Sequence, residues 1–280
     1  MSILNAPLSR GDLPVAISSS QWLVESVLNG TIARPQHVAA FFSNTGDEHA
    51  WTYEAIERHV DRTAPESVSG RCVRVRMNGS PSALQRSSMR GERARLDNPP
   101  FWTENPGGGR GKLAQRCTQI WKTRPLRAAQ SAWVKSLGLP KRVETWIGFG
   151  KDEQHRAIKA VARNDVQRAT QAFPAIQLGK PRAEQRADLA RWGCEAPLFS
   201  MCVHCPFKSE ERWHQTGAKD LAKAIEIDEA IRDGLSHVAV QEPAYLFDGL
   251  IPVADLVRGE RRRAEPLAQI PGCDDGACFV

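Results

Sequence analysis

The sequence predicts an α/β protein built on a five-stranded parallel sheet with flanking helices, followed by a helical C-terminal part. Short apolar runs alternate with amphipathic stretches through the first half of the chain, and this alternation is typical of strand–helix–strand units with parallel strands. The 280 residues and the 41% hydrophobic content are sufficient for one large domain, or for one domain with a small appendage.

Five short apolar runs are expected to form the sheet. Their lengths suit strands rather than helices. They cover residues 13–17, 37–42, 72–77, 143–149 and 173–178. Cys72, in the third run, alternates with polar neighbours and is expected to be a buried strand thiol.

Amphipathic stretches between and after these runs predict the helices. Several end at a glycine, the usual C-terminal stop of a helix. The predicted helices cover residues 21–28, 51–60, 122–137, 152–161, 182–192 and 220–232, with a further helix beginning near residue 209 and a short final element at 245–257.

One long segment, residues 78–112, shows no periodicity. It is rich in Arg, Ser, Pro and Gly, so we expect a long loop with at most a short helix near residues 82–90. The predicted division is a nucleotide-binding domain at 1–180, a helical subdomain at 181–257 and a flexible tail at 258–280.

Composition limits the location and the partners. No stretch approaches the roughly 18 apolar residues needed to cross a bilayer, and residues 1–15 lack the apolar core of a signal peptide. We therefore expect a cytoplasmic protein without a membrane partner. The net charge of +6 indicates affinity for phosphates, either of a nucleotide or of a nucleic acid.

Ligands of open parallel sheets bind beyond the carboxyl ends of the strands, so the residues after each strand are the candidate site. After the first strand come Ser18, Ser19 and Ser20, whose hydroxyls and helix-start N–H groups suit phosphate, or alternatively simple N-capping. The turn after the second strand supplies Thr45, Gly46 and Asp47.

Charged residues follow the fourth strand and begin the helix at 122–137. Lys151, Asp152, Glu153 and Arg156 suit phosphate and Mg²⁺, or alternatively an ordinary capped helix with acidic residues in its first turn. Lys122 and Arg124 flank a helix start, where cations gain nothing from the helix dipole, and this indicates an anionic partner.

Five of the seven cysteines lie late in the chain, which in a reducing compartment favours metal binding or thiol chemistry. Cys202 and Cys205 form a CxxC turn that suits one metal, a cluster or a redox pair. Further ligands would come from Cys194, from Cys117, or from the tail. The tail cysteines are Cys273 and Cys278.

Several segments, in order along nearly the whole chain, resemble one family. They cover residues 42–48, 98–109, 116–126, 146–156, 202–207, 226–232 and 272–278. They are similar to the PAPS reductase-like (CysH-like) ATP pyrophosphatases of the adenine nucleotide alpha hydrolase type. The similarity is to the phage- and mobile-element-borne branch, some members of which are associated with CRISPR type IV systems.

The resemblance implies a Rossmann-like sheet that binds ATP or a related adenine nucleotide with Mg²⁺, and often a homodimer. It implies ATP cleavage between the α and β phosphates or sulfur-transfer chemistry, with an iron–sulfur cluster or Zn²⁺ on cysteines. By this resemblance Cys117 joins Cys202 and Cys205 as a metal ligand. Lys122 and Arg124 hold phosphate or sulfate oxygens, and the Cys273/Cys278 tail supplies a catalytic thiolate.

The first loop departs from the family pattern, because residues 18–20 are all serine where relatives have glycines. Glycine permits the close backbone approach that a pyrophosphate cradle needs. Hydrolysis could therefore be lost while nucleotide binding survives. Two alternatives to an ATP pyrophosphatase follow. One is a non-catalytic accessory protein that contacts a nucleic acid or a ribonucleoprotein. The other is an enzyme that thiolates nucleic acid.

Overall fold

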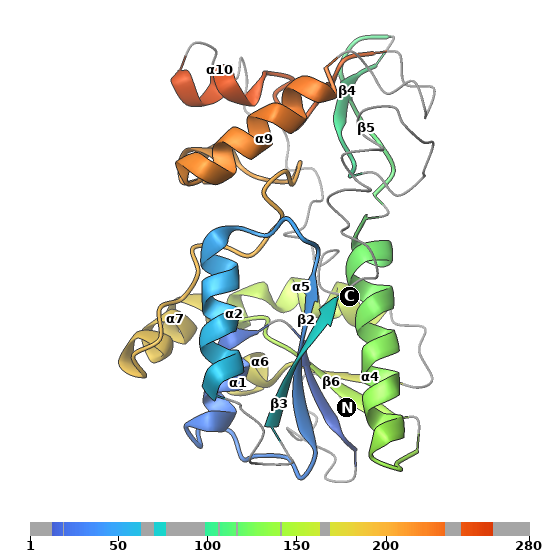
Figure 1. The fold of residues 1–280 in the computed structure, drawn as a ribbon, viewed down its shortest axis with the longest axis vertical. Helices are drawn as coiled ribbons and strands as arrows, with labels where there is room; N and C mark the ends of the chain where they lie inside the picture. Colours follow the sequence, from blue (N-terminus) through green and yellow to red (C-terminus); the bar gives the residue numbers. More distant parts are fainter. Residues whose placement is uncertain are drawn as a thin grey trace.

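The computed structural model describes residues 13–18, 20–62, 70–76, 99–105, 107–115, 117–140, 142–162, 169–232 and 242–259. Within them the chain forms two lobes, a larger one around a parallel sheet and a smaller one built largely from later residues (Figure 1).

The larger lobe contains a sheet in which all neighbouring strands are parallel. Its strands are β1 (Val15–Ser18), β2 (Val38–Asn44), β3 (Gly70–Arg76), β6 (Val143–Ile147) and β7 (Ala169–Ala172). Their order is β3-β2-β1-β6-β7. The predicted α/β class with a parallel, helix-flanked sheet is confirmed.

Helices cover both faces of this sheet (Figure 1). They are α1 (Gln21–Leu28), α2 (Ala50–Arg62), α4 (Arg124–Ser136), α5 (Gln154–Ala162), α6 (Pro174–Gln177) and α7 (Arg182–Arg191). Side chains alternate along a strand, so Val15 and Ile17 of β1 pack with α1, whereas Ala16 packs with α4. The sheet is therefore buried on both sides, as its apolar strands require.

The prediction for the last strand of the sheet was wrong in position. The structure places strand β7 at Ala169–Ala172, and the predicted strand 173–178 contains the short helix α6. Pro174 lies in the first turn of α6, where a missing N–H costs nothing, whereas in a strand it would remove a ladder bond. The apolar run there is the buried face of a helical turn, and a short run does not distinguish the two.

The smaller lobe combines helices with a three-stranded antiparallel sheet. The strands are β4 (Trp102–Glu104), β5 (Arg110–Lys112) and β8 (Ala244–Tyr245), in the order β5-β4-β8. The helices are α8 (Glu210–His214), α9 (Ala218–Ala230) and α10 (Val253–Arg258). The prediction of a helical C-terminal part is thus incomplete, and the element predicted at 245–257 is divided between β8 and α10.

The hairpin of β4 and β5 also corrects the predicted loop 78–112. Gly108 and Gly109 both have φ of 82°, a left-handed conformation that glycine adopts cheaply, and they turn the chain back on itself. Trp102 of β4 is buried and donates its indole N–H to the Pro206 carbonyl, which ties the hairpin to the CxxC turn. The predicted helix at 82–90 lies outside the described residues, as does the tail from residue 260.

No helix in the described part of the chain is both long and apolar enough to cross a membrane.

Candidate functional site at the end of the parallel sheet

A cavity of about 500 Å³ lies at the carboxyl ends of β1, β2 and β6. The chain builds the sheet outward from β1 in one direction through β2 and β3, and then returns to the other side of β1 for β6 and β7. The strand order therefore reverses between β1 and β6. The cavity spans this switch point, because Ser18 ends β1 and Gly148 follows β6, and both line it.

The serine loop meets Gly148 at close range. Ser20 is the N-cap of α1, and its hydroxyl accepts a hydrogen bond from the Leu23 N–H at 3.4 Å. A Cβ at Gly148 would lie 2.1 Å from the Ser20 Oγ, so only glycine leaves room for this approach. Ser18 and Ser20 both line the cavity, whereas Ser19 lies outside the described residues. Ser20 therefore both caps α1 and lines the cavity.

The acidic residues after β6 fix the loop against α7. Asp152 accepts a hydrogen bond from the Arg182 N–H at 2.9 Å. Glu153 accepts one from the Gly150 N–H at 3.0 Å and forms ion pairs with Arg156 and Arg182. Four of these residues line the cavity: Asp152, Glu153, Arg156 and Arg182. This end of the cavity therefore has guanidinium groups in its wall, which suit phosphate oxygens.

The three predicted ligand thiols line the other end of the same cavity. Cys117 precedes the π-helical turn η2 (Thr118–Thr123), and Cys202 and Cys205 come from the CxxC turn. The Cys202 Sγ lies 3.4 Å from the Thr45 Oγ1 and 3.8 Å from the Glu48 Oε1. One cavity thus joins the nucleotide and cysteine sites that the sequence predicts separately.

Lys122 is the cation at the thiol end. Its Nζ lies 3.2 Å from the Glu48 Oε1, and Glu48 is buried. Burial works against the charged amine, but the attraction of the Glu48 carboxylate, and of the nearby cysteines when they are thiolates, outweighs it, so the pKa of Lys122 is raised. Lys122 is therefore a fixed positive charge at neutral pH.

Burial raises the pKa of all three thiols. It brings the pKa of Cys117 to about 11, and it also raises the pKa of Cys205. For Cys202, burial and the negative charge of Glu48 act in the same direction. The thiols are consequently protonated at neutral pH, and thiolate chemistry requires a ligand that stabilises the charged form.

A metal site needs several ligand side chains that converge on one point. Among the described residues, no group of three or more His, Cys, Asp or Glu side chains is arranged to hold a metal ion. The carboxylates proposed for Mg²⁺ already bind backbone N–H groups and arginines. The set of Cys117, Cys202 and Cys205 as metal ligands stays a prediction.

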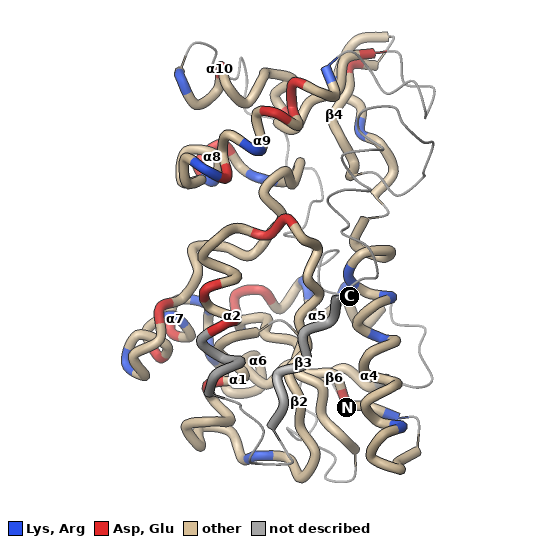
Figure 2. The backbone as a smooth tube through the Cα atoms, viewed as in Figure 1, with Lys and Arg blue, Asp and Glu red and all other residues tan. Residues whose placement is uncertain are grey.

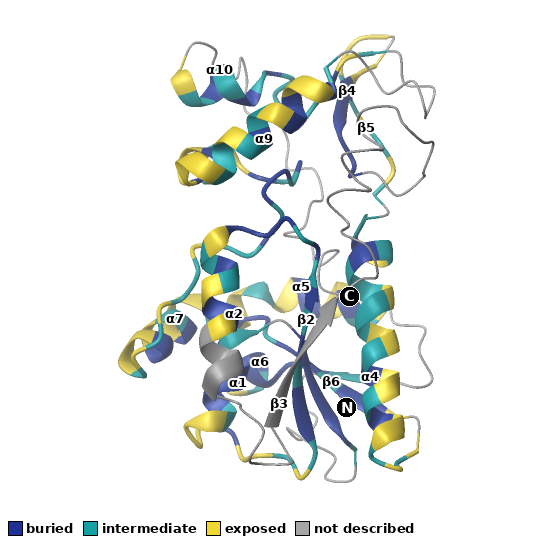
Figure 3. Cartoon of the chain, viewed as in Figure 1, coloured by how far each residue is buried: buried dark blue, intermediate teal, exposed yellow. Residues whose placement is uncertain are grey.

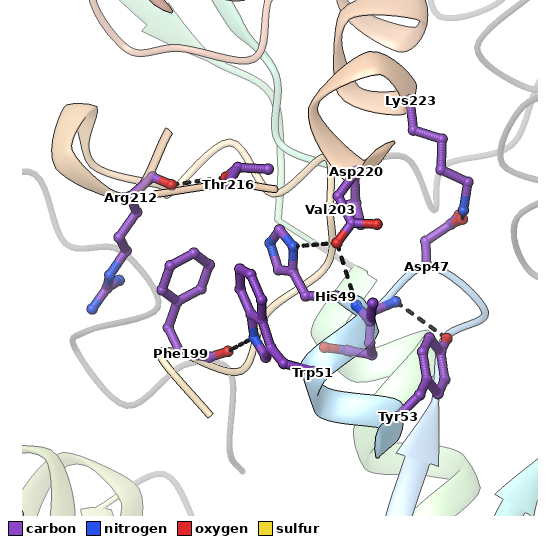
Figure 4. A network of polar contacts seen from close by, with 12 residues as sticks. Asp47, His49, Trp51, Tyr53, Phe199, Val203, Arg212, Thr216, Asp220 and Lys223 are labelled. Carbon is purple, nitrogen blue, oxygen red and sulfur yellow. Dashed lines mark hydrogen bonds and ion pairs between the residues drawn. The ribbon is translucent and has the colours of Figure 1, made fainter. Parts of the chain in front are cut away.

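The turn Thr45–Gly46–Asp47 is hydrogen-bonded to the CxxC turn. Its three residues are not among the described residues that line the cavity. The Val203 N–H donates to the Asp47 carbonyl at 2.6 Å, and the Asp47 carboxylate pairs with Lys223 of α9 at 3.2 Å. Figure 4 shows this pair beside the start of α2. The turn therefore positions the cysteines and joins the two lobes.

Two further predicted site residues point elsewhere. Arg124, on α4, and Lys151, after β6, are exposed and are not among the described residues that line the cavity. The predicted nucleophiles Cys273 and Cys278 lie outside the described residues.

A buried polar network beside the CxxC turn had no counterpart in the sequence predictions (Figure 4). The His49 Nδ1 lies 2.9 Å from the Asp220 carboxylate, and its Nε2 lies 3.2 Å from the Lys208 Nζ. Lys208 also donates to the Val203 carbonyl at 2.8 Å. These residues are far apart in the sequence, so only His49, which follows the second strand closely, offered a signal.

Burial governs the charges of this network. Burial and the nearby Lys208 lower the pKa of His49 to about 4, and burial lowers the pKa of Lys208 to about 8. Neutral His49 accepts from the Lys208 ammonium through Nε2, so its proton is on Nδ1 and is donated to Asp220. The network holds the backbone of the CxxC turn in place.

Comparisons with protein-family models, with curated proteins and with solved structures found no match to this chain.

Proposed function

We propose that the chain binds an adenine nucleotide in the switch-point cavity and cleaves ATP between its α and β phosphates, as a PAPS reductase-like ATP pyrophosphatase. The observation that carries this proposal is the position of the cavity across the reversal between β1 and β6. Open parallel sheets bind ligands at this point, because the strand ends and helix N-termini converge there. The expected nucleotide alpha hydrolase-like fold, with strands on both sides of β1, is part of the same proposal.

The wall of the cavity suits the two halves of a nucleotide. At the switch point, Ser18, Ser20, Arg156 and Arg182 offer hydroxyls and cations to phosphates, and the N–H groups at the start of α1 add to them. Apolar side chains line another part and would pack on a base. They are Phe42, Ala55, Ile56, Pro197, Leu198 and Phe199.

The thiol end supports sulfur-transfer chemistry on the bound nucleotide. Cys117, Cys202 and Cys205 line the same cavity as the phosphate-binding wall, so an activated nucleotide would lie beside them. Lys122 supplies positive charge there for phosphate or sulfate oxygens. An iron–sulfur cluster or Zn²⁺ on these thiols would lower their pKa and keep them as thiolates.

A second candidate function is nucleotide binding without hydrolysis, as in an accessory protein. Two observations favour it. The Ser20 hydroxyl already caps α1, and the Glu153 carboxylate already holds Gly150, Arg156 and Arg182. The Ser20 hydroxyl therefore offers a phosphate only its remaining O–H donor, and the Glu153 carboxylate is not available to a metal without breaking these contacts.

Product analysis distinguishes the two candidates. We expect protein incubated with ATP and Mg²⁺ to release AMP and pyrophosphate, separated by anion-exchange chromatography. Arg182→Gln should slow the reaction by roughly tenfold to a hundredfold, since one charge-assisted hydrogen bond contributes about 1.5–3 kcal/mol. Arg191→Gln, on the exposed end of the same helix, is the matched control and should leave the rate unchanged.

Each other outcome has a definite meaning. Release of ADP and phosphate would contradict cleavage at the α–β position. Bound ATP without products would favour the accessory function. Activity that is equal in wild-type protein and Arg182→Gln would not come from this cavity.

A further inference from the structure

Positive charge is concentrated in one segment that the nucleotide site does not explain. Between Leu113 and Val143 the sequence has seven Lys and Arg residues and no Asp or Glu. The net charge of this segment exceeds the +6 of the whole chain. Its main element is α4.

The helix α4 turns its cations away from the protein. Its inner face packs on the sheet through Trp133 and Val134. Its outer face carries exposed Arg124, Arg127 and Lys135. Lys and Arg positions are blue along α4 in Figure 2, and Figure 3 shows exposed positions in yellow on the same helix, beside intermediate and buried ones. The residues exposed between these cations are small, namely Ala128, Ser131 and Ala132.

Acidic residues that could neutralise these cations are absent from the helix itself. The first turn of α4 contains no Asp or Glu, and Arg124 occupies it. The preceding helical turn η2 (Thr118–Thr123) runs directly into α4 and has no acidic residue either. The cations of α4 therefore have no carboxylate partner one turn away along the helix.

No carboxylate neutralises this face among the described neighbours. Among the described elements, those with the most extensive contact to α4 are η2, β2, β3 and β6, and within these four the acidic residue is Glu144 of β6. Glu144 is buried and accepts a hydrogen bond from the indole N–H of Trp146. In the described part of the chain, the outer face of α4 is therefore positive along its length.

We propose that this face of α4, defined by Arg124, Arg127 and Lys135, binds the phosphate backbone of a nucleic acid. Arg124 and Lys135 are eleven positions apart, which is about 16 Å along a helix. A duplex strand has one phosphate per about 3.4 Å of axis, so several phosphates lie within reach of the three cations. The small residues between them let the backbone approach the helix closely. Binding to phosphates in this way is independent of base sequence.

The position of the face connects it with the cavity. Arg124 follows directly on η2, whose Lys122 lines the cavity, so a strand laid along α4 reaches the cavity at the N-terminal end of the helix. The proposal does not depend on nucleotide binding, and its test uses no nucleotide.

The test is fluorescence anisotropy with a labelled 20-nucleotide DNA, single-stranded and as a duplex, at several salt concentrations. We expect binding that weakens with salt. Each neutralised phosphate contributes about −0.9 to the slope of log K against log salt, so three cations predict a slope of about −3 for the duplex. The triple variant R124Q/R127Q/K135Q should bind at least tenfold more weakly at low salt and with a slope near zero.

The control variant removes the same charge elsewhere. R34Q/R191Q/K219Q neutralises three exposed cations outside α4 and should keep the wild-type slope. Circular dichroism verifies the fold of both variants. The proposal is overturned if wild-type protein does not bind either DNA at low salt, if the α4 variant binds like wild type, or if both variants weaken binding equally.

Discussion

Single residues around the CxxC turn show how the chain holds its cysteines. His49, Lys208 and Asp220 form a buried chain of hydrogen bonds, and Lys208 anchors the backbone at Val203. His49 also stacks on Trp51, with 4.4 Å between ring centroids. Protonation of His49 would put a second cation beside Lys208 inside this cluster.

Acid should therefore destabilise the fold. The pKa of His49 falls from its ordinary 6.5 to about 4 on folding, so between these values the unfolded chain binds a proton that the folded chain does not. Stability should decrease as the pH falls from about 6.5 to about 4. Burial also lowers the pKa of His204 to about 4, and it acts in the same direction.

Urea denaturation at pH 7 and at pH 4.5 measures this effect. His49→Gln should lose less stability between the two pH values than wild-type protein does. His214→Gln, at an exposed position in α8, serves as the control and should behave like wild type. A wild-type stability that is equal at both pH values would contradict the role of these histidines.

At the scale of residues, the position after a strand was the useful signal in the sequence, and the function of these residues stays a prediction. Ser18, Ser20, Asp152, Glu153 and Arg156 were predicted in this way, and the structure places them on one cavity. Lys208 and Asp220 were missed because their environment depends on tertiary packing. Neither lies near a strand end or in a motif.

At the scale of elements, the parallel strands and long helices were predictable because their apolar patterns are long enough to show a period. The hairpin of β4 and β5 was not, because each strand has only three residues. Such strands carry almost no pattern of their own. The helix α6 was mistaken for a strand for a related reason: its buried run is a single turn.

One residue of α9 organises the smaller lobe. The buried Asp228 carboxylate accepts hydrogen bonds from the N–H of Leu246, directly after β8, and from the N–H of Val253, at the start of α10. It also accepts one from Arg232. Asp228→Ala would leave two buried N–H groups and a cation without this acceptor. We expect a loss of about 3–5 kcal/mol, as for a broken buried pair.

Urea denaturation of Asp228→Ala against Asp255→Ala checks this value. Asp255 pairs with exposed Arg258 on α10, so its removal should cost less than about 1 kcal/mol. Equal losses in the two variants would show that Asp228 is not the centre of the lobe.

At the scale of the whole molecule, the central feature is one cavity that extends from the switch point of the sheet to the cysteines. The serine loop, the residues after β6 and the CxxC turn contribute to it from distant parts of the chain. The general position of such a site follows from parallel topology. Its extension to the thiols does not, since it depends on how the CxxC turn packs against Thr45 and Glu48.

The most direct test of this account is a calorimetric titration of ATP into anaerobically purified protein. We predict binding with a micromolar Kd in wild-type protein and in Gly217→Ala, where an added methyl group meets open space. Gly148→Ala places a methyl group where the Ser20 hydroxyl lies and should weaken binding at least tenfold. Thermal unfolding establishes that each variant is folded. Absence of ATP binding in wild-type protein, or equal affinity in the two glycine variants, would contradict a nucleotide site at the switch point.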